Sequence, residues 1–506
     1  MKKVVLVLFL IFLFSSSVSA EEGLRSLFLN NKAVICGINI RNFNSKDINH
    51  NGIIDNGEES GNFVNALERL DEVKDLHINT LHVLPITPVG KLKALGTAGS
   101  LYAISDFTSI NPQIVDKTSD LTPQEQFKNF IDECHKRGIY VVIDLPSCGS
   151  YDLFLSHPEY FLKDKKQLSI VPTDWTDVRL FNTGNNDRLN DDLLNAHKAF
   201  IDMITEAGAD GVRADVATIK PSKFWEELIS YSRKMNPEFM FLAEASDSWR
   251  EPPSKYAEFT PYDELLRAGF DGYYGSFFNF KDWKSSEEFI EHIKFNKKLT
   301  ASYSEPKSVI LSFTTHDELS PIVLRGEKLS VMISWLEATL PFNPYIIDGF
   351  PYGDDYVYPW ANNKAAYTET DDDYYFVHRG KLDIFNYSRK PEGNNQTVSM
   401  NFKKATQFRE ENADLISKGT FVPLKTDNDS VFAYARCYKG ETIIVLGNLD
   451  YKKNVRRVII KYNGIKKKSV VQSVRGLQNY KIKNNRIITD FSPYEIKVLR
   501  VTDLSL

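Results

Sequence analysis

The sequence predicts an α/β fold: a (β/α)8 TIM barrel with an insertion after its third strand, followed by a C-terminal antiparallel β-sandwich domain. Between residues 33 and 348, eight short apolar segments alternate with stretches of helical spacing, the count of a parallel eight-stranded barrel. Beyond residue 417, strand-like segments follow one another without helices between them, as in an antiparallel β domain. A chain of 506 residues is long enough for both.

Residues 1–20 have the pattern of a signal peptide. Two lysines follow Met1, residues 4–14 are apolar, and Val18-Ser19-Ala20 offers a small-residue cleavage site. The apolar run is too short to span a bilayer, and no later stretch of the sequence qualifies. We therefore expect an exported protein, periplasmic or extracellular, with no membrane attachment after cleavage.

Composition argues against nucleic acid as a partner, and it does not decide whether the cysteines form disulfides. The net charge of −5 implies no general affinity for nucleic acid. The hydrophobic share of 42% and charged share of 25% are ordinary for a globular protein. Four cysteines in an exported chain could form two disulfides, and predicted strand positions suggest that Cys36 and Cys148 lie near each other.

Eight segments are expected to form the barrel strands. They are Ala33–Asn39, Thr80–Pro85, Tyr140–Asp144, Asp210–Val216, Phe239–Glu244, Phe270–Tyr274, Ser308–Phe313 and Asn343–Asp348. The helix before the third strand opens on the capping box Thr122-Pro123-Gln124-Glu125 and is closed by Gly138. Residues 193–207 are predicted to form the helix before the fourth strand.

The boundaries of the barrel follow from breaks in this alternation. Residues 145–187 form a longer, less regular stretch than a normal βα loop, which predicts an insertion that shapes a cleft over the barrel mouth. A helix is expected over 402–416. We therefore expect a barrel domain over 21–417 and a β domain over 418–506, with strands at Val431–Ala435, Thr442–Leu446, Val455–Lys461 and Ile496–Val501.

The fourth strand carries two opposite charges. Arg213 and Asp215 are separated by one residue, so both side chains point to the same face of the strand. Opposite charges on a buried face are costly unless they are paired, and they usually serve chemistry or form a structural ion pair. The motif alone does not decide between these two interpretations.

Two further strands end in carboxylates. Glu244 follows the apolar run 241–243, and Asp317 follows the seventh strand. In a parallel barrel these ends meet Asp215 at the carboxyl-terminal face, where active sites lie. Clustered carboxylates suit glycosidic cleavage, whose transition state is positively charged. Asp215, kept ionised by Arg213, suits the nucleophile; Glu244, in an apolar setting that favours its protonated form, suits the acid/base; Asp317 would bind sugar hydroxyls and stabilise the transition state.

Three motifs resemble those of a known family. Residues 210–215, 241–245 and 313–317 resemble the catalytic motifs of the α-amylase superfamily, glycoside hydrolase family 13. Residues 99–107 and 340–345 are similar to two further segments of that family, so the resemblance covers most of the chain. It implies a retaining mechanism on α-glucosidic bonds of starch-like or malto-oligosaccharide substrates. It also implies substrate-pocket roles for Tyr102, Arg213, His316 and Asp144.

The first motif departs from the family pattern. The family's Asp normally continues to an Asn-His pair, but after Asp144 this sequence has Cys148 and Gly149 at those places. The Lys-His pair of many α-amylases is replaced by Thr218 and Ile219. A cysteine after the third strand is similar to the maltosyltransferase branch. We expect the same chemistry in a rebuilt pocket, with substrate linkage and length left open.

A second motif, in residues 47–58, predicts a structural calcium site. Oxygen donors fall at positions 1, 3, 5, 9 and 12 of the loop, Gly52 is placed for the sharp turn, and a backbone carbonyl supplies position 7. The predicted Ca²⁺ ligands are Asp47, Asn49, Asn51, Ile53, Asp55 and Glu58. The loop is similar to the calcium loop after the first strand in oligo-1,6-glucosidase-like members of the family. The alternative is a cluster of Asx-Gly turns.

Other functions remain to be weighed against hydrolysis. Transglycosylation uses the same residues and differs only in the acceptor, so the sequence does not separate the two. A non-catalytic carbohydrate-binding relative is disfavoured because all three carboxylates are present. A metal-dependent hydrolase is rejected because the catalytic strand ends supply a single histidine, His316, as a metal ligand, and because the predicted calcium loop lies elsewhere in the chain. Three tryptophans in predicted mouth loops could line sugar subsites or simply pack: Trp175, Trp249 and Trp360.

Overall fold

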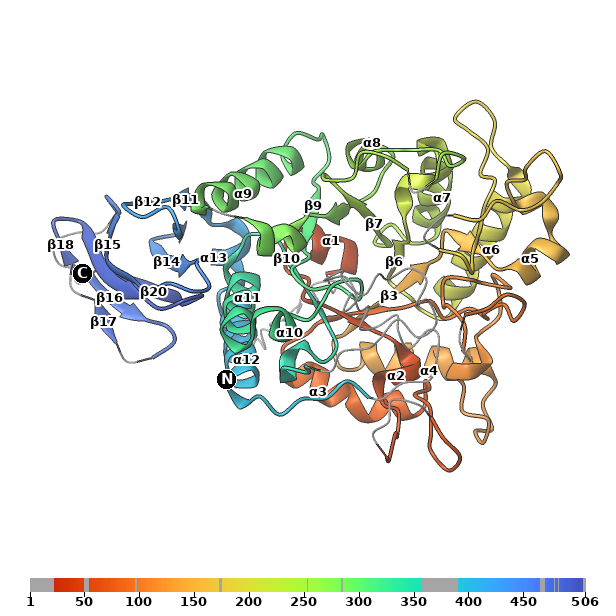
Figure 1. Ribbon diagram of the computed structural model, residues 1–506, viewed down its shortest axis with the longest axis horizontal. Coiled ribbons are helices and arrows are strands. Elements are labelled where there is room, and N and C mark those ends of the chain that lie inside the picture. The colour runs from red at the N-terminus through yellow and green to blue at the C-terminus, as the bar shows by residue number, and fades with distance from the viewer. Residues whose placement is uncertain are drawn as a thin grey trace, which may run out of the picture.

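The computed structural model describes residues 22–503 with internal gaps (Figure 1). Outside the description lie residues 1–21, 50–53, 96–97, 173–174, 253, 284, 356–389, 465–468, 477, 481 and 504–506. The predicted signal peptide, Trp360 and the calcium-loop positions Asn51 and Ile53 are therefore outside the described residues. No helix among the described residues is long and apolar enough to cross a membrane.

Eight parallel strands close into a barrel, which confirms the predicted fold class. The strand order around the barrel is β1-β10-β9-β8-β7-β6-β3-β2, with every neighbouring pair parallel. The strands are β1 Ile35–Ile38, β2 Thr80–Val83, β3 Tyr140–Leu145, β6 Gly211–Ala214, β7 Met240–Ser246, β8 Gly272–Tyr274, β9 Ser308–Leu311 and β10 Asn343–Ile347. Each lies within or beside its predicted segment, because buried parallel strands are continuous apolar runs.

Helices surround the barrel, one before the first strand and the others between or after the strands (Figure 1). They are α1 Leu24–Leu29, α2 Ile40–Phe43, α3 Leu70–Asp75, α4 Pro123–His135, α5 Tyr151–Ser156, α6 Asp191–Glu206, α7 Ser222–Met235, α8 Tyr262–Arg267, α9 Ser286–Thr300, α10 Pro321–Arg325, α11 Glu327–Thr339, α12 Gln396–Glu411 and α13 Ala413–Lys418. The predicted capping box is present, since Thr122 and Glu125 exchange side-chain to backbone hydrogen bonds at the start of α4. The single helix predicted over 402–416 is wrong: Asn412, at φ −118° and ψ 27°, separates α12 from α13.

The C-terminal strands form two antiparallel sheets, as predicted. One has the order β11-β13-β14-β20-β16-β17 and the other β12-β15-β19-β18. Their strands are β11 Thr420–Pro423, β12 Lys425–Thr426, β13 Val431–Tyr438, β14 Glu441–Asn448, β15 Val455–Lys461, β16 Ser469–Ser473, β17 Asn479–Tyr480, β18 Ile482–Lys483, β19 Arg486–Phe491 and β20 Ile496–Asp503. Phe289 of α9 packs on Phe432 of β13 with ring centroids 4.7 Å apart. This apolar contact joins the β domain to the barrel.

The stretch 145–187 is a small folded insertion at the end of the molecule opposite the β domain (Figure 1). Its described part contains α5 and a hairpin of β4 Cys148–Gly149 with β5 Arg179–Leu180. Phe161 and Phe181 pack with centroids 5.0 Å apart and give the insertion an aromatic core. A side chain at Gly149 would meet both rings within 3 Å, so this position has no room for the histidine of the family pattern.

Cys36 and Cys148 do not form the disulfide that the sequence allows. All four cysteines are described, and all four are free thiols in the structure. Cys36 lies in β1 and Cys148 in the hairpin of the insertion, where both are buried among apolar neighbours. Burial raises the pKa of both thiols, which keeps them protonated and unreactive.

Candidate active site

Arg213 lies at the centre of the candidate site, at the carboxyl end of β6. Its Nη1 lies 2.9 and 3.0 Å from the two carboxylate oxygens of Asp144, near the carboxyl end of β3, and 3.1 Å from Oδ1 of Asp215. Its Nη2 lies 2.7 Å from Oε1 of Glu244 on β7. Arg213 and Asp144 are fully buried, whereas Asp215 and Glu244 each keep 7% of their surface exposed. One guanidinium therefore gathers three carboxylates from three strand ends.

The buried Asp144 is held in its charged form. Burial alone would raise the pKa of Asp144, but the charge of Arg213 and a contact with His82 together lower it to about 2. The hydroxyl of Tyr102 also donates to Asp144, with an O···O distance of 2.8 Å. Asp144 thus binds Arg213 on the buried side of the cluster, whereas Asp215 and Glu244 lie on its more exposed side.

Tyr102 and His316 form a second unit beside this cluster. Their rings are nearly parallel, at 7° with centroids 6.1 Å apart, and the tyrosine hydroxyl lies 2.9 Å from His316 Nε2. The same nitrogen lies 3.4 Å from Oδ2 of Asp317, whose side chain is 23% exposed. The structure therefore brings Asp317 and the predicted pocket residues into one connected network with Asp144.

The turn after β6 is strained and aimed at Glu244. Val216 has φ 32° and ψ 56°, a left-handed conformation that β-branched residues rarely adopt. In this conformation its backbone N–H donates to Oε2 of Glu244 over 2.7 Å. Glu244 therefore contacts both a guanidinium and a backbone amide, and its surroundings are more polar than the apolar setting expected from the sequence.

His82 is a site residue that sequence reasoning missed. It lies in β2, fully buried, with Nδ1 2.7 Å from the hydroxyl of Tyr345 and Nε2 3.4 Å from Asp144. Burial lowers the pKa of His82 despite that carboxylate. The available signal was a histidine inside the apolar run 80–85, which points into a barrel whose interior holds a buried acid.

Ser147 lies in the segment that departs from the family's first motif, and it contacts Asp215. The backbone N–H of Ser147 donates to Asp215 Oδ2 over 3.1 Å, and its hydroxyl donates to the main-chain oxygen of Asp215. The hydroxyl of Ser147 in turn accepts a hydrogen bond of 2.6 Å from the ammonium of Lys220. Cys148 packs with Ile219 in a small apolar cluster against which Trp175 lies. Neither Ser147 nor Lys220 was singled out from the sequence.

The described part of loop 47–58 is closed by Glu58. Its carboxylate accepts backbone N–H bonds from Ile48 at 2.7 Å, Asn49 at 3.0 Å and Asp55 at 2.8 Å, which lower its pKa. The Asn49 amide donates to Asp55 over 2.8 Å. These hard oxygen donors are of the kind that Ca²⁺ binds. Among the described residues, no group of three or more Asp, Glu, His or Cys side chains is arranged to hold a metal ion.

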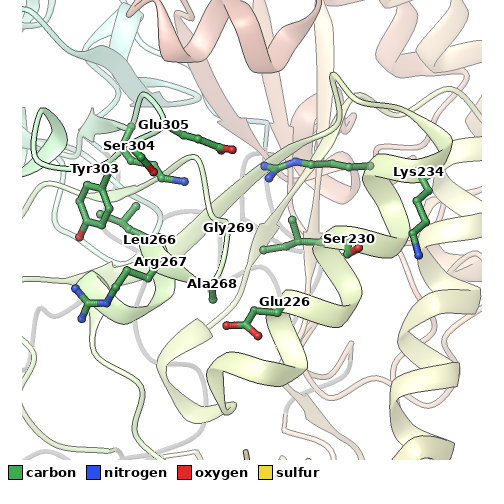
Figure 2. A pocket seen from close by; sticks show the side chains of 13 residues that line it. Glu226, Ser230, Lys234, Leu266, Arg267, Ala268, Gly269, Tyr303, Ser304 and Glu305 are labelled. Atoms are coloured by element: carbon green, nitrogen blue, oxygen red, sulfur yellow. The ribbon is translucent and has the colours of Figure 1, made fainter.

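A hollow of about 590 Å³ lies at the other end of the barrel (Figure 2). Residues of α7, the end of α8 and the segment before β9 line it, near the amino ends of the strands. Its arginines are already paired, since Arg233 binds Asp271 and Arg267 binds Asp263, each at 2.7 Å. Residues at the amino-terminal face of a barrel usually contribute to stability rather than to catalysis. The hollow is separate from the candidate site.

Comparison with known proteins supports a relationship at low sequence identity. No protein-family model matches the chain. It is 22% identical over 494 residues to α-amylase 3 of Dictyoglomus thermophilum, which covers 88% of this chain and 90% of that protein. It is 26% identical over 415 residues to an α-1,4-glucan:maltose-1-phosphate maltosyltransferase of Picrophilus torridus, covering 77% of this chain. The chain spans 59% of the length of that transferase.

Solved structures give the same answer for the fold. An α-amylase from Lactobacillus plantarum superposes with a TM-score of 0.70 at 20% identity, covering 93% of this chain and 99% of that one. A maltogenic α-amylase from Thermotoga neapolitana gives a TM-score of 0.68 at 22% identity, covering 94% and 99%. In sequence the chain is therefore similar to enzymes of the α-amylase family (glycoside hydrolase family 13), and it shares with the solved α-amylases the architecture of a barrel and a C-terminal β domain.

Proposed function

We propose that the protein is a retaining glycosidase that cleaves α-glucosidic bonds of starch-like or malto-oligosaccharide substrates. The observation that carries this proposal is the single buried guanidinium of Arg213, which gathers Asp144, Asp215 and Glu244 at the barrel mouth. The relationship to α-amylases, and to proteins whose names specify α-1,4-glucan transfer, supports the substrate class.

The proposed reaction is a double displacement. Asp215 attacks the anomeric carbon while the bond to the glycosidic oxygen breaks, and Glu244 gives that oxygen its proton. Water then loses a proton to Glu244 and attacks the same carbon, which releases Asp215. Because Glu244 contacts Arg213 in the free protein, substrate entry must loosen this ion pair before Glu244 serves as the acid. Asp317, the most exposed of the three acids, would hold sugar hydroxyls.

Transglycosylation is the second candidate, favoured by the maltosyltransferases among the relatives. The deciding experiment is a screen of α-1,4-, α-1,6- and α-1,1-linked glucosides, with and without an added sugar acceptor, in which NMR follows the anomeric configuration. Hydrolysis yields free α-configured sugar in both conditions, whereas a transferase yields longer products only with acceptor. A net-inverted product would overturn the mechanism. Tight oligosaccharide binding without any cleavage would indicate a non-catalytic relative instead.

We also propose that residues 47–58 bind a structural Ca²⁺ through Asp47, Asn49, Asn51, Ile53, Asp55 and Glu58. The ion would replace the internal hydrogen bonds by which Glu58 now closes the loop. Saturating Ca²⁺ is expected to raise the melting temperature of EDTA-treated protein by roughly 5 °C, because a ligand that binds only the folded state stabilises it.

The matched control for this calcium prediction is Asp55→Ala, which removes one oxygen ligand. This variant should lose the calcium-dependent rise in melting temperature, while addition of Mg²⁺ to the unchanged protein should give little rise. Identical melting curves with EDTA and with Ca²⁺ would contradict the site.

Export through the signal peptide 1–20 is proposed as well, to the periplasm or the medium. The mature chain should then begin at Glu21, and N-terminal sequencing of protein recovered outside the cytoplasm checks this. Recovery of the chain only from the cytoplasm, with Met1 intact, would contradict it.

A further inference from the structure

Lys220 is a buried cation that lacks an acidic partner in the part of the chain that the structure describes. It is 1% exposed and follows the turn after β6. Its ammonium donates to the hydroxyl of Ser147 at 2.6 Å and to the carbonyl oxygen of Ser147 at 3.4 Å, and it lies 5.5 Å from the ring centroid of Trp225. It forms no ion pair with any carboxylate among the described residues. A buried charge of this kind is costly, so its position calls for a function.

Ser147 connects this ammonium to Asp215. Its hydroxyl accepts from Lys220 and donates to the main-chain oxygen of Asp215, while its own N–H donates to the Asp215 carboxylate over 3.1 Å. Ser147 thus holds both the backbone and the side chain of the proposed nucleophile. An ammonium that polarises this hydroxyl strengthens the hydrogen bond that the hydroxyl makes.

The segment that Ser147 contacts is the strained turn after β6, which contains Asp215 and Val216. Val216, next to Asp215, is in the left-handed conformation and donates its N–H to Glu244 over 2.7 Å. Farther along, the Trp225 indole donates to the Ala217 oxygen at 2.9 Å, and Thr260 donates to the Lys220 oxygen at 2.8 Å. A strained backbone persists only where its surroundings fix it in this way.

We propose that Lys220 is a positioning residue that acts through Ser147 to fix the Asp215–Val216 turn, so that the nucleophile and the acid/base face the substrate in register. The role rests on the proposed function, because it concerns the geometry of the two carboxylates in that reaction. It assigns a purpose to Ser147, which contacts Asp215, and to Lys220, which contacts Ser147. The displacement of a nucleophile by about 1 Å can cost about 100-fold in rate.

The charge state of Lys220 supports this role. Burial lowers the pKa of Lys220 to about 8, against the opposing effects of Cys148 and Asp215. Within the described residues, His197 of α6 also interacts electrostatically with Lys220, and burial lowers the pKa of His197 to about 3, so this histidine is neutral. Lys220 is therefore mostly protonated at pH 7 and loses its charge as the pH rises through about 8. The rate should fall over that interval.

The test compares Lys220→Met, Ser147→Ala and their double variant, with Lys223→Met as the control at an exposed position of α7. Each single variant is expected to lose about 10- to 100-fold in kcat with KM changed by less than about threefold. The double variant should lose no more than the worse single variant, because both act on one connection. Lys220→Met should also lose the decline above pH 8 and melt no lower than the unchanged protein.

Three results would overturn the proposal. The first is that Lys220→Met keeps the wild-type kcat and still loses activity above pH 8. The second is that the loss of kcat in the double variant equals the product of the two single losses. The third is that each variant loses kcat only in proportion to its loss of melting temperature. If Lys220→Met does not fold, Ser147→Ala carries the test alone through its split between kcat and KM. The proposed function fails separately, when the unchanged protein cleaves no α-glucoside at all.

Discussion

Replacing Asp215 by Asn is expected to lower kcat on maltodextrins and aryl α-glucosides by roughly 10³-fold or more. The amide has nearly the same shape as the carboxylate but cannot form the glycosyl ester, and it loses the charge that faces the anomeric carbon. Arg213 keeps Asp144 and Glu244 as partners, so the fold should persist. The measurement is steady-state kinetics on protein whose folding is verified by circular dichroism.

Asp210→Asn is the matched control for this prediction. Asp210 belongs to the same run of sequence but lies at the amino end of the strand, where it pairs with His135 at 2.9 Å and accepts the Val141 N–H at 2.7 Å. Its replacement removes the same charge at the opposite end of the strand from Asp215 and should leave kcat within a few-fold of wild type. Full activity of Asp215→Asn would show that Asp215 is not the nucleophile.

Replacing Arg213 by Met has the largest expected effect on stability, a loss of about 3–5 kcal/mol in the free energy of unfolding. The side chain is fully buried and pairs with Asp144, Asp215 and Glu244, so its removal takes the guanidinium charge away from three clustered carboxylates. Arg213→Lys keeps the charge but not the planar fork that reaches several partners, and should fall between Met and wild type. Denaturant unfolding of the three proteins measures the series.

The same cluster predicts how stability depends on pH. The pKa of Asp144 is about 2 in the folded protein against an ordinary value of 3.8. A lowered acid pKa gives stability that is complete above the ordinary value and is lost as the pH falls toward the folded value. Wild type should therefore lose roughly 2 kcal/mol between about pH 4 and pH 2, and Arg213→Met should lose much less of it. An equal loss of unfolding free energy in both proteins between pH 4 and pH 2 would contradict this role of Asp144.

The sequence predicted the barrel because its strands are apolar runs buried on both faces, and such runs are visible in one dimension. The strand-end residues were also recognisable, since topology brings all carboxyl ends to one face. Lys220 and His82 were not, because their burial depends on which elements pack over them. The break at Asn412 is likewise a local conformational choice that the helical spacing of 402–416 does not reveal. At Gly149, the rings of Phe161 and Phe181 explain the missing side chain only after the insertion has folded.

The central claim is that Asp215 forms a covalent glycosyl-enzyme, and direct trapping tests it. A fluorinated α-glucosyl fluoride slows both displacement steps while its good leaving group preserves the first, so the intermediate accumulates. Peptide mapping by mass spectrometry should then find one glucosyl adduct on the peptide that contains Asp215, absent from Asp215→Asn. An adduct on a different carboxylate, or turnover with net inversion and no adduct, would contradict the claim.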